Sequence, residues 1–323
     1  MTESSSPYLH GFSPVEQARL IKQARLLEST LFNHVDYTGV RRLLEVGSGV
    51  GAQTEILLRR FPDLHATCVD LNQVQLDAAR DNLAKMPWCR DRYTLQQADA
   101  SRLPFGARDF DAAFLCWILE HVPNPARVLS EVRRVLAPGS PIYVTEVMNS
   151  SFLLHPYSPN TWRYWMAFND FQYDSGGDPF IGAKLGNLLL AGGYRDVVTE
   201  IKTVHFDNRE PARRKDMIAF WEELLLSAAD SMVEAGRVTQ DVVDGMRQEM
   251  RDVQNDPDAV FFYAFVQARA TVLTDRPIAH DPRPPAAREA RARRQAWRAQ
   301  GSVRDARCDA TWPPTDGPDR RHP

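Results

Sequence analysis

The sequence predicts an α/β protein built on a doubly wound, mostly parallel, seven-stranded sheet with helices on both faces. Two observations support this prediction. Between residues 41 and 147, short apolar runs alternate with segments of helical periodicity, the rhythm of right-handed strand–helix–strand crossovers. Directly after the first apolar run, the turn "EVGSGVG" carries three glycines on alternate positions, Gly47, Gly49 and Gly51.

Seven stretches have the length and apolar content of strands. They are Arg42–Val46, His65–Val69, Tyr93–Gln97, Asp111–Leu115, Pro141–Val147, Asp196–His205 and Val260–Ala270. Helical spacing of apolar residues predicts helices before, between and after these strands. The expected helices are Pro14–Asn33, Gln53–Arg60, Asn72–Lys85, Ala126–Leu136 and Ala183–Ala191, with a helical insertion from Pro211 to Val253.

Composition divides the chain into five parts. Residues 1–38 are expected to form an N-terminal helical cap, residues 39–148 the ligand-binding core and residues 149–182 an aromatic lid insertion. Residues 183–274 complete the core and contain the helical insertion 211–253. Residues 275–323 are rich in Arg and Pro and hold almost no large aliphatic side chains, so they cannot offset the entropy cost of ordering. We expect a disordered tail whose removal changes activity little.

Charge and cysteine content argue against several classes of protein. A formal net charge of −3 and a pI near 6.3 give no overall attraction to nucleic acid or anionic membranes. The sequence lacks an apolar run of the ~18 residues that a membrane-spanning helix needs, and it lacks a secretory signal pattern. The cysteines (Cys68, Cys89, Cys116, Cys308) show no CxxC spacing, so we expect reduced thiols, no metal site and a cytoplasmic protein.

The three glycines predict a loop that binds a ligand. A sharp strand-to-helix turn that lets a ligand approach the backbone needs residues without Cβ, and the following helix N-terminus favours an anionic group. Ordinary tight turns also use glycine. Gly47-x-Gly49-x-x-Ala52, with Asp70 further along, even fits the fingerprint of nicotinamide-dinucleotide folds.

A longer pattern separates these alternatives. The segment Glu45-Val-Gly-Ser-Gly-Val-Gly51 resembles the ExGxGxG signature of class I S-adenosylmethionine (SAM) methyltransferases, a family with a Rossmann-like fold. Four further blocks follow in that family's order: "CVDLN", "QQADASRLPF", "FDAAFLCWILEHVPNP" and "VLAPGSPIYVTE". The resemblance covers roughly residues 43–147. A dinucleotide fold predicts neither the block around Asp99 nor the loop around His121.

The resemblance implies SAM as the cofactor and gives several residues a role. Asp70 would accept hydrogen bonds from the ribose diol, and Leu71 would pack against adenine. Asp99 would accept a hydrogen bond from the adenine amino group, and the Ala100 N–H would donate to a ring nitrogen. The alternative for Asp99 is an Asx turn before Pro104.

Two further residues, Glu45 and Cys116, have a role in the family. Glu45 either holds the methionine ammonium or braces the glycine loop. Cys116 ends the fourth strand, where the family offers a backbone carbonyl to that ammonium.

Catalysis by such a protein needs little beyond alignment of the acceptor, because the sulfonium is already activated. A hydroxyl acceptor would want a general base, and His121 is the candidate; the alternative is a histidine that orients SAM or caps a helix. Glu146 and His155 are weaker candidates of the same kind.

The aromatic segment predicts where the acceptor binds. Its side chains form either a lid over an apolar ligand, a contact in a homodimer, or ordinary core. The candidate acceptor-binding residues are Tyr8, Trp117, His155, Tyr157, Trp162, Trp165 and Phe171.

The sequence thus predicts a SAM-dependent methyltransferase acting on a small molecule such as a natural product. Absence of an Asn-Pro pair in "FLCWILEHV" argues against DNA base methylation, and we expect no nucleic-acid or membrane partner. Two alternatives stay open: a SAM-binding protein of the same fold without methyl transfer, and a NAD-dependent oxidoreductase.

Overall fold

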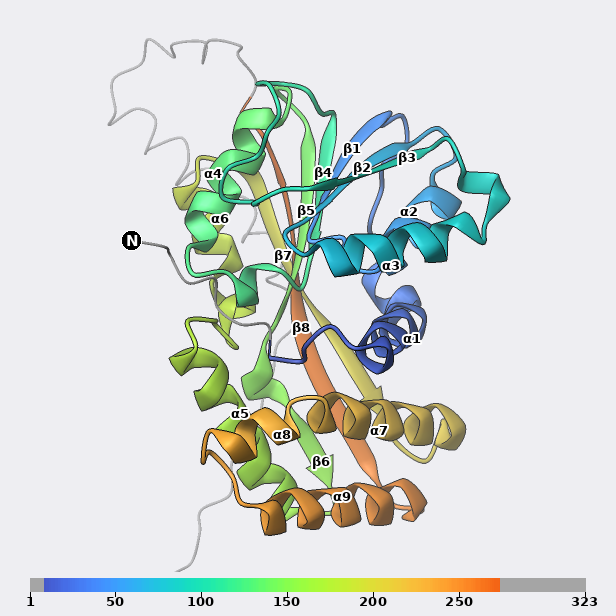
Figure 1. Cartoon of the computed structure of the whole chain (residues 1–323), viewed down its shortest axis with the longest axis vertical. Helices are drawn as coiled ribbons and strands as arrows, with labels where there is room; N and C mark the ends of the chain where they lie inside the picture. The colour runs from blue at the N-terminus through green and yellow to red at the C-terminus, as the bar shows by residue number, and fades with distance from the viewer. Residues whose placement is uncertain (1–8, 274–323) are drawn as a thin grey trace, which may run out of the picture. The chain divides into compact units, whose positions relative to one another are not determined.

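The computed structural model describes residues 9–273 of the 323-residue chain. Its centre is an eight-stranded sheet (Figure 1). The strands are β1 Arg42–Val46, β2 His65–Asp70, β3 Tyr93–Gln97, β4 Ala112–Cys116, β5 Pro141–Val147, β6 Leu153–His155, β7 Arg195–Phe206 and β8 Val260–Thr271. The predicted fold class is therefore confirmed, and each of the seven predicted strands lies within two residues of its expected place.

The strand order is β3-β2-β1-β4-β5-β8, and β7 pairs with the other edge of β8. Strands β1 to β5 run parallel, whereas β8 is antiparallel to β5, β6 and β7. The apolar runs of β1 and β4 are buried along almost their whole length, as expected of central strands covered on both faces. β6 is the strand that the sequence did not predict. It has only three residues, and its pairing depends on β8, more than 100 positions away.

Helices cover both faces of the parallel part. Their bounds are α1 Pro14–Leu31, α2 Ala52–Arg60, α3 Gln73–Ala84, α4 Pro125–Val135, α5 Pro159–Asp174, α6 Leu185–Ala191, α7 Pro211–Leu226, α8 Ala229–Glu234 and α9 Gln240–Asn255. Short 3₁₀ turns are η1 Pro87–Cys89, η2 Leu119–His121, η3 Asn149–Ser151 and η4 Ile181–Lys184. Helices α2 and α3 lie on one side of β1–β5, and α4 and α6 lie on the other (Figure 1).

Local chemistry fixes several of these helix starts. The Ser13 hydroxyl accepts the Glu16 N–H at the start of α1, and the Asn72 side chain accepts the Val74 and Gln75 N–H groups at the start of α3. Such caps satisfy amide groups that have no partner within the helix. They fix the residue at which each of the two helices begins.

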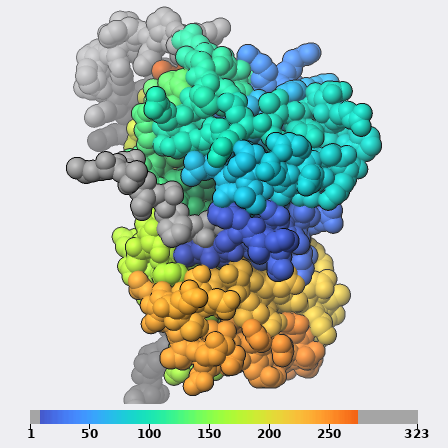
Figure 2. Space-filling model, in the orientation of Figure 1, coloured from blue at the N-terminus to red at the C-terminus, as the bar shows by residue number. Residues whose placement is uncertain are grey.

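The predicted helical insertion is three helices, α7, α8 and α9, which gather with α5 around the far halves of β7 and β8 (Figure 1). This region has its own apolar core, formed largely by aromatic side chains. Helix α1 packs against both α2 and α7, so it lies between this region and the parallel part (Figure 2).

Two predictions lie outside the described residues: the tail 275–323 and Tyr8. Between residues 9 and 273, no helix is long and apolar enough to cross a bilayer. Over the same range, no three His, Cys, Asp or Glu side chains are grouped so that they could hold a metal ion.

Candidate active site

A cavity of about 520 Å³ opens at the C-terminal ends of the parallel strands and extends toward α5 and α7. This volume is in the range of small-molecule sites, and the position is where open α/β sheets bind ligands. One part, here the glycine-loop half, is formed by the loops after β1, β2 and β3. The other, the aromatic half, is lined by Trp165, Phe168, Phe220, Trp221, Phe261 and Tyr263.

The glycine loop takes a path that side chains would block. Gly47 has φ of +73°, and a Cβ there would lie 2.8 Å from the Ile118 side chain. The N–H groups of Gly47 and Ser48 both donate to the Val69 carbonyl, which fastens the loop to the end of β2. Gly49 has φ of +50°, and a Cβ at this position would meet nothing within 4 Å. The loop is therefore fixed from behind and leaves its front accessible to a ligand.

Asp70 ends β2 and braces this loop. One carboxylate oxygen accepts the Gly49 N–H at 2.9 Å, and the other accepts the Asn72 N–H at 2.9 Å. Burial raises the pKa of Asp70, while these backbone hydrogen bonds act in the opposite direction. A carboxylate has about four lone-pair positions, so two acceptor positions remain for a ligand diol.

Asp99 lines the cavity and also forms a local turn. Its carboxylate accepts the Ser101 N–H at 2.8 Å, which is the Asx turn that the sequence analysis kept as an alternative. Ala100 and the exposed Leu71 line the same part of the cavity.

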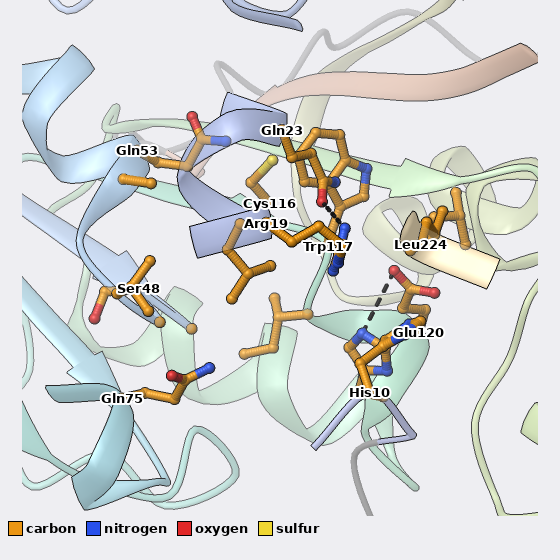
Figure 3. Close-up of a pocket in the computed structure, with 18 of the residues that line it drawn as sticks. His10, Arg19, Gln23, Ser48, Gln53, Gln75, Cys116, Trp117, Glu120 and Leu224 are labelled. Atoms are coloured by element: carbon orange, nitrogen blue, oxygen red, sulfur yellow. Dashed lines mark hydrogen bonds and ion pairs between the residues drawn. The ribbon is translucent and has the colours of Figure 1, made fainter. Parts of the chain in front are cut away.

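Two buried polar atoms near the glycine loop have no hydrogen-bond partner among residues 9–273: Ser48 Oγ and the side-chain oxygen of Gln53. Both residues line the cavity (Figure 3). An unpartnered buried acceptor costs roughly 1–3 kcal/mol, so a donor from a ligand would stabilise the loop. This fits a ligand that carries an ammonium group.

Glu45 does not line the cavity. Its side chain is 2% exposed and accepts the Thr54 hydroxyl at 2.6 Å, so it joins β1 to α2 behind the loop. Burial raises its pKa to about 7. Of the two roles that the sequence left open, the structure supports bracing.

The loop after β4 carries the polar junction between the two halves. Trp117 adopts φ of +55°, uncommon for a residue with a side chain, and lines the cavity. Glu146 on β5, fully buried, accepts the N–H groups of Ile118, Leu119 and Glu120. It thereby fixes the backbone of η2, which places Glu120 and His121 in the cavity wall.

Several polar side chains gather around Glu120. Its carboxylate accepts the Gln172 amide at 2.8 Å and lies 3.6 Å from His121 Nε2. His10, from the segment before α1, points toward Glu120 (Figure 3). The His10 Nδ1 lies 2.6 Å from the Ser227 hydroxyl, and its ring packs against Phe168. Burial, together with the nearby Arg19 and His121, holds the pKa of His10 well below its usual value.

Glu146 and Glu120 form a buried pair of carboxyl groups. Burial and the charge of Glu120 raise the pKa of Glu146 well above its usual value. Simultaneous ionisation of the two neighbouring carboxyl groups is therefore disfavoured.

Most of the predicted site residues meet in this cavity. Those that line it are Gly47, Gly49, Asp70, Leu71, Asp99, Ala100, Cys116, Trp117, His121 and Trp165. Six others, besides Glu45, do not line it: Gly51, Glu146, His155, Tyr157, Trp162 and Phe171.

Their surroundings explain these departures. Gly51 begins α2 with φ of +75° and faces α3, where a Cβ would lie 3.2 Å from Leu83. Tyr157 is 74% exposed, Trp162 on α5 is partly buried against the aromatic core, and Phe171 lies under the Arg237 guanidinium. His155 is exposed on β6. The prediction of Gly51 came from the glycine motif, whereas the other four treated nearness in sequence as nearness in space.

Sequence reasoning missed the contribution of α1, α7 and β8. Arg19 and Gln23 project from α1 into the cavity, hydrogen-bonded to each other at 2.9 Å (Figure 3). Phe220 and Tyr263 come from elements that were predicted only as helix and strand. The polar positions Arg19 and Gln23, four residues apart, interrupt the helix face that contains Leu20 and Leu27, and this was the available signal.

Comparison with known proteins finds similarity to methyltransferases. Residues 44–144 match the family model described as a methyltransferase domain. This match covers the strands that carry the glycine loop, Asp70 and Asp99. Residues 44–144 are therefore similar to a methyltransferase domain.

Two curated relatives are similar over parts of their length. The O-methyltransferase cnsE of Penicillium expansum is 31% identical over 165 residues, 50% of this chain and 54% of the relative. A 27-O-demethylrifamycin SV methyltransferase of Amycolatopsis mediterranei is 29% identical over 130 residues, 40% of this chain and 47% of the relative. The chain matches about half the length of these relatives.

A solved structure shares the fold. Phosphoethanolamine N-methyltransferase 2 of Haemonchus contortus, determined in complex with SAM, superposes with a TM-score of 0.52 at 16% identity. The superposition covers 83% of this chain and 59% of that one.

Proposed function

We propose that this protein is a SAM-dependent methyltransferase that transfers a methyl group to a small-molecule acceptor. The observation that carries the proposal is the convergence of Gly49, Asp70 and Asp99 on one cavity that continues into an aromatic half. The named relatives are methyltransferases, two of them acting on oxygen by their names.

The residues of the glycine-loop half fit SAM. Asp70 would bind the ribose diol, Leu71 would cover adenine, and Asp99 with the Ala100 N–H would bind the adenine edge. The unpartnered oxygens of Ser48 and Gln53 suit the ammonium of the methionine part, beside the end of β4 at Cys116.

SAM supplies a methyl group on a sulfonium that is already a good leaving group. The protein's own contribution is to hold the acceptor in line with that methyl and to exclude water. The aromatic half suits this, since Trp165 and Phe168 present rings stacked at 5.6 Å to an apolar acceptor.

A calorimetric titration with S-adenosylhomocysteine (SAH) tests whether the glycine-loop half binds the cofactor, and no measurable binding would refute the proposal. Incubation with SAM and a library of apolar acceptors, monitored by SAH release, tests whether the protein transfers the methyl group. The homodimer and the cytoplasmic location stay predictions, the former to be checked by light scattering.

A further inference from the structure

The aromatic half of the cavity is lined mainly by aromatic rings, with Asn149 and the Tyr263 hydroxyl among its polar groups. Its walls include two parallel ring pairs, Trp165–Phe168 at 5.6 Å and 5°, and Phe152–Trp221 at 5.4 Å and 7°. Trp165, Phe168 and Trp221 line the cavity, and Phe152 supports them from the core. Flat aromatic walls of this kind accommodate a flat or polycyclic apolar molecule.

At the junction, Glu120 is a buried carboxylate held in one orientation. It is 7% exposed, its backbone is fixed by Glu146, and its carboxylate is bound by Gln172 and flanked by His121. Of these two neighbouring acidic side chains, Glu120 lines the cavity, whereas the Glu146 carboxylate is turned to the backbone N–H groups of η2.

His10 points toward Glu120, and its Nδ1 lies 2.6 Å from the Ser227 hydroxyl (Figure 3). The groups that surround Glu120 and His10 are Arg19, His121, Glu146 and Tyr263.

This arrangement discriminates between acceptor classes. An anionic acceptor would meet the Glu120 carboxylate. A cationic amine would lie near the Arg19 guanidinium and the positive sulfonium of SAM, and would have to lose a proton before attack. A neutral hydroxyl can donate to Glu120 and carries no charge that these groups oppose.

We propose, on the basis of the proposed function, that Glu120 accepts the proton of a hydroxyl group on a flat, apolar acceptor. The O–H proton passes to a Glu120 carboxylate oxygen as the hydroxyl oxygen forms its bond with the methyl carbon. The sulfur–methyl bond breaks, and its electron pair returns to sulfur, giving the neutral thioether SAH. Glu120 is the catalytic residue; Gln172, His10 and His121 are positioning residues that orient its carboxylate.

The test uses 7-hydroxycoumarin, whose absorption spectrum reports ionisation of its hydroxyl, and 7-methoxycoumarin, which has the same ring without that proton. Both are titrated into the SAH-loaded full-length protein across a pH series. We expect the bound hydroxycoumarin to ionise at least one pH unit above the free compound, because the Glu120 carboxylate opposes a second negative charge beside it. Glu120→Gln should abolish this difference and change methoxycoumarin binding less than twofold.

Matched variants test whether the effect on the hydroxycoumarin comes from Glu120 or from another side chain. Glu234→Gln, at an exposed carboxyl on α8, should leave the difference unchanged, and His10→Gln and His121→Gln should reduce it without abolishing it. The proposal is overturned if the bound hydroxycoumarin ionises as in water, or if neither coumarin binds. It is also overturned if His121→Gln abolishes the difference while Glu120→Gln keeps it. Calorimetry with SAH is performed first, so that loss of SAH binding counts against the proposed function and not against Glu120.

Discussion

The Asp70 carboxylate has two roles: it accepts the Gly49 N–H, and it faces the cavity. Hydrogen bonds to charged groups contribute about 1.5–3 kcal/mol each. Asp70→Ala should therefore weaken SAH binding by about 3 kcal/mol, on the order of a hundredfold, as measured by calorimetry.

The control for this variant is Asp63→Ala, an exposed turn residue, which should bind SAH as the unchanged protein does. Equal affinities of the Asp70 and Asp63 variants would remove the assignment of Asp70 to the ribose.

Glu45 predicts a dependence of stability on pH. Its pKa is about 7 in the folded protein, against an ordinary value of 4.5, so the folded state keeps a proton that the unfolded chain releases between these values. Its contribution to the free energy of unfolding therefore falls as pH rises through this window, by about 3 kcal/mol at most.

Glu45→Gln mimics the protonated side chain and should remove this fall. Urea unfolding at pH 5 and pH 8 should show the variant gaining stability relative to the parent at the higher pH, whereas Glu234→Gln should gain none. Parallel pH profiles of Glu45→Gln and the parent would contradict the assignment.

At the scale of elements, α5 begins with an unusual cap. Ser158 gives the helix no side-chain cap, and its hydroxyl donates to the Pro156 carbonyl instead. The carboxylate of Glu249 on α9 takes over this role, because it accepts the backbone N–H groups of Asn160 and Thr161 and both side chains. The aromatic wall on α5 thus depends on a residue 89 positions further along.

Glu249→Ala should lower the free energy of unfolding by about 2–3 kcal/mol, because two buried amide groups lose a charged acceptor. SAH affinity should change less than twofold, because the glycine loop is untouched. Glu234→Ala should change stability by less than about 0.5 kcal/mol. Unfolding of the Glu249 variant at the parent's urea midpoint would show that α5 does not need this cap.

The same scale explains which parts of the site the sequence could predict. The glycine loop, Asp70 and Asp99 lie at the ends of consecutive parallel strands, so spacing along the chain suffices to bring them together. Phe220 and Tyr263 join the cavity only through packing of α7 and β8, which no local pattern encodes. Tyr157 fails for the opposite reason: an aromatic residue near the site in sequence turns outward to solvent.

For the whole molecule, ligand binding should appear as stability. SAH at a hundred times its dissociation constant should add about 2.7 kcal/mol and raise the midpoint of thermal unfolding by about 5–10 °C. NAD at the same concentration should not raise it, which separates the methyltransferase from the oxidoreductase alternative. A rise with NAD and none with SAH would reverse that choice.

One feature joins the two halves of the cavity. Strand β8 runs without interruption from its pairing with β6, beside the aromatic half, to its pairing with β5, beside the parallel sheet, and β7 accompanies it over most of its length. A bend at the middle of β8 would break several of its hydrogen bonds to the neighbouring strands at once. The strands β7 and β8, which set the spacing between the methyl donor and the methyl acceptor, are therefore stiff. Ligands must enter and leave through movements of side chains, loops or helices around them.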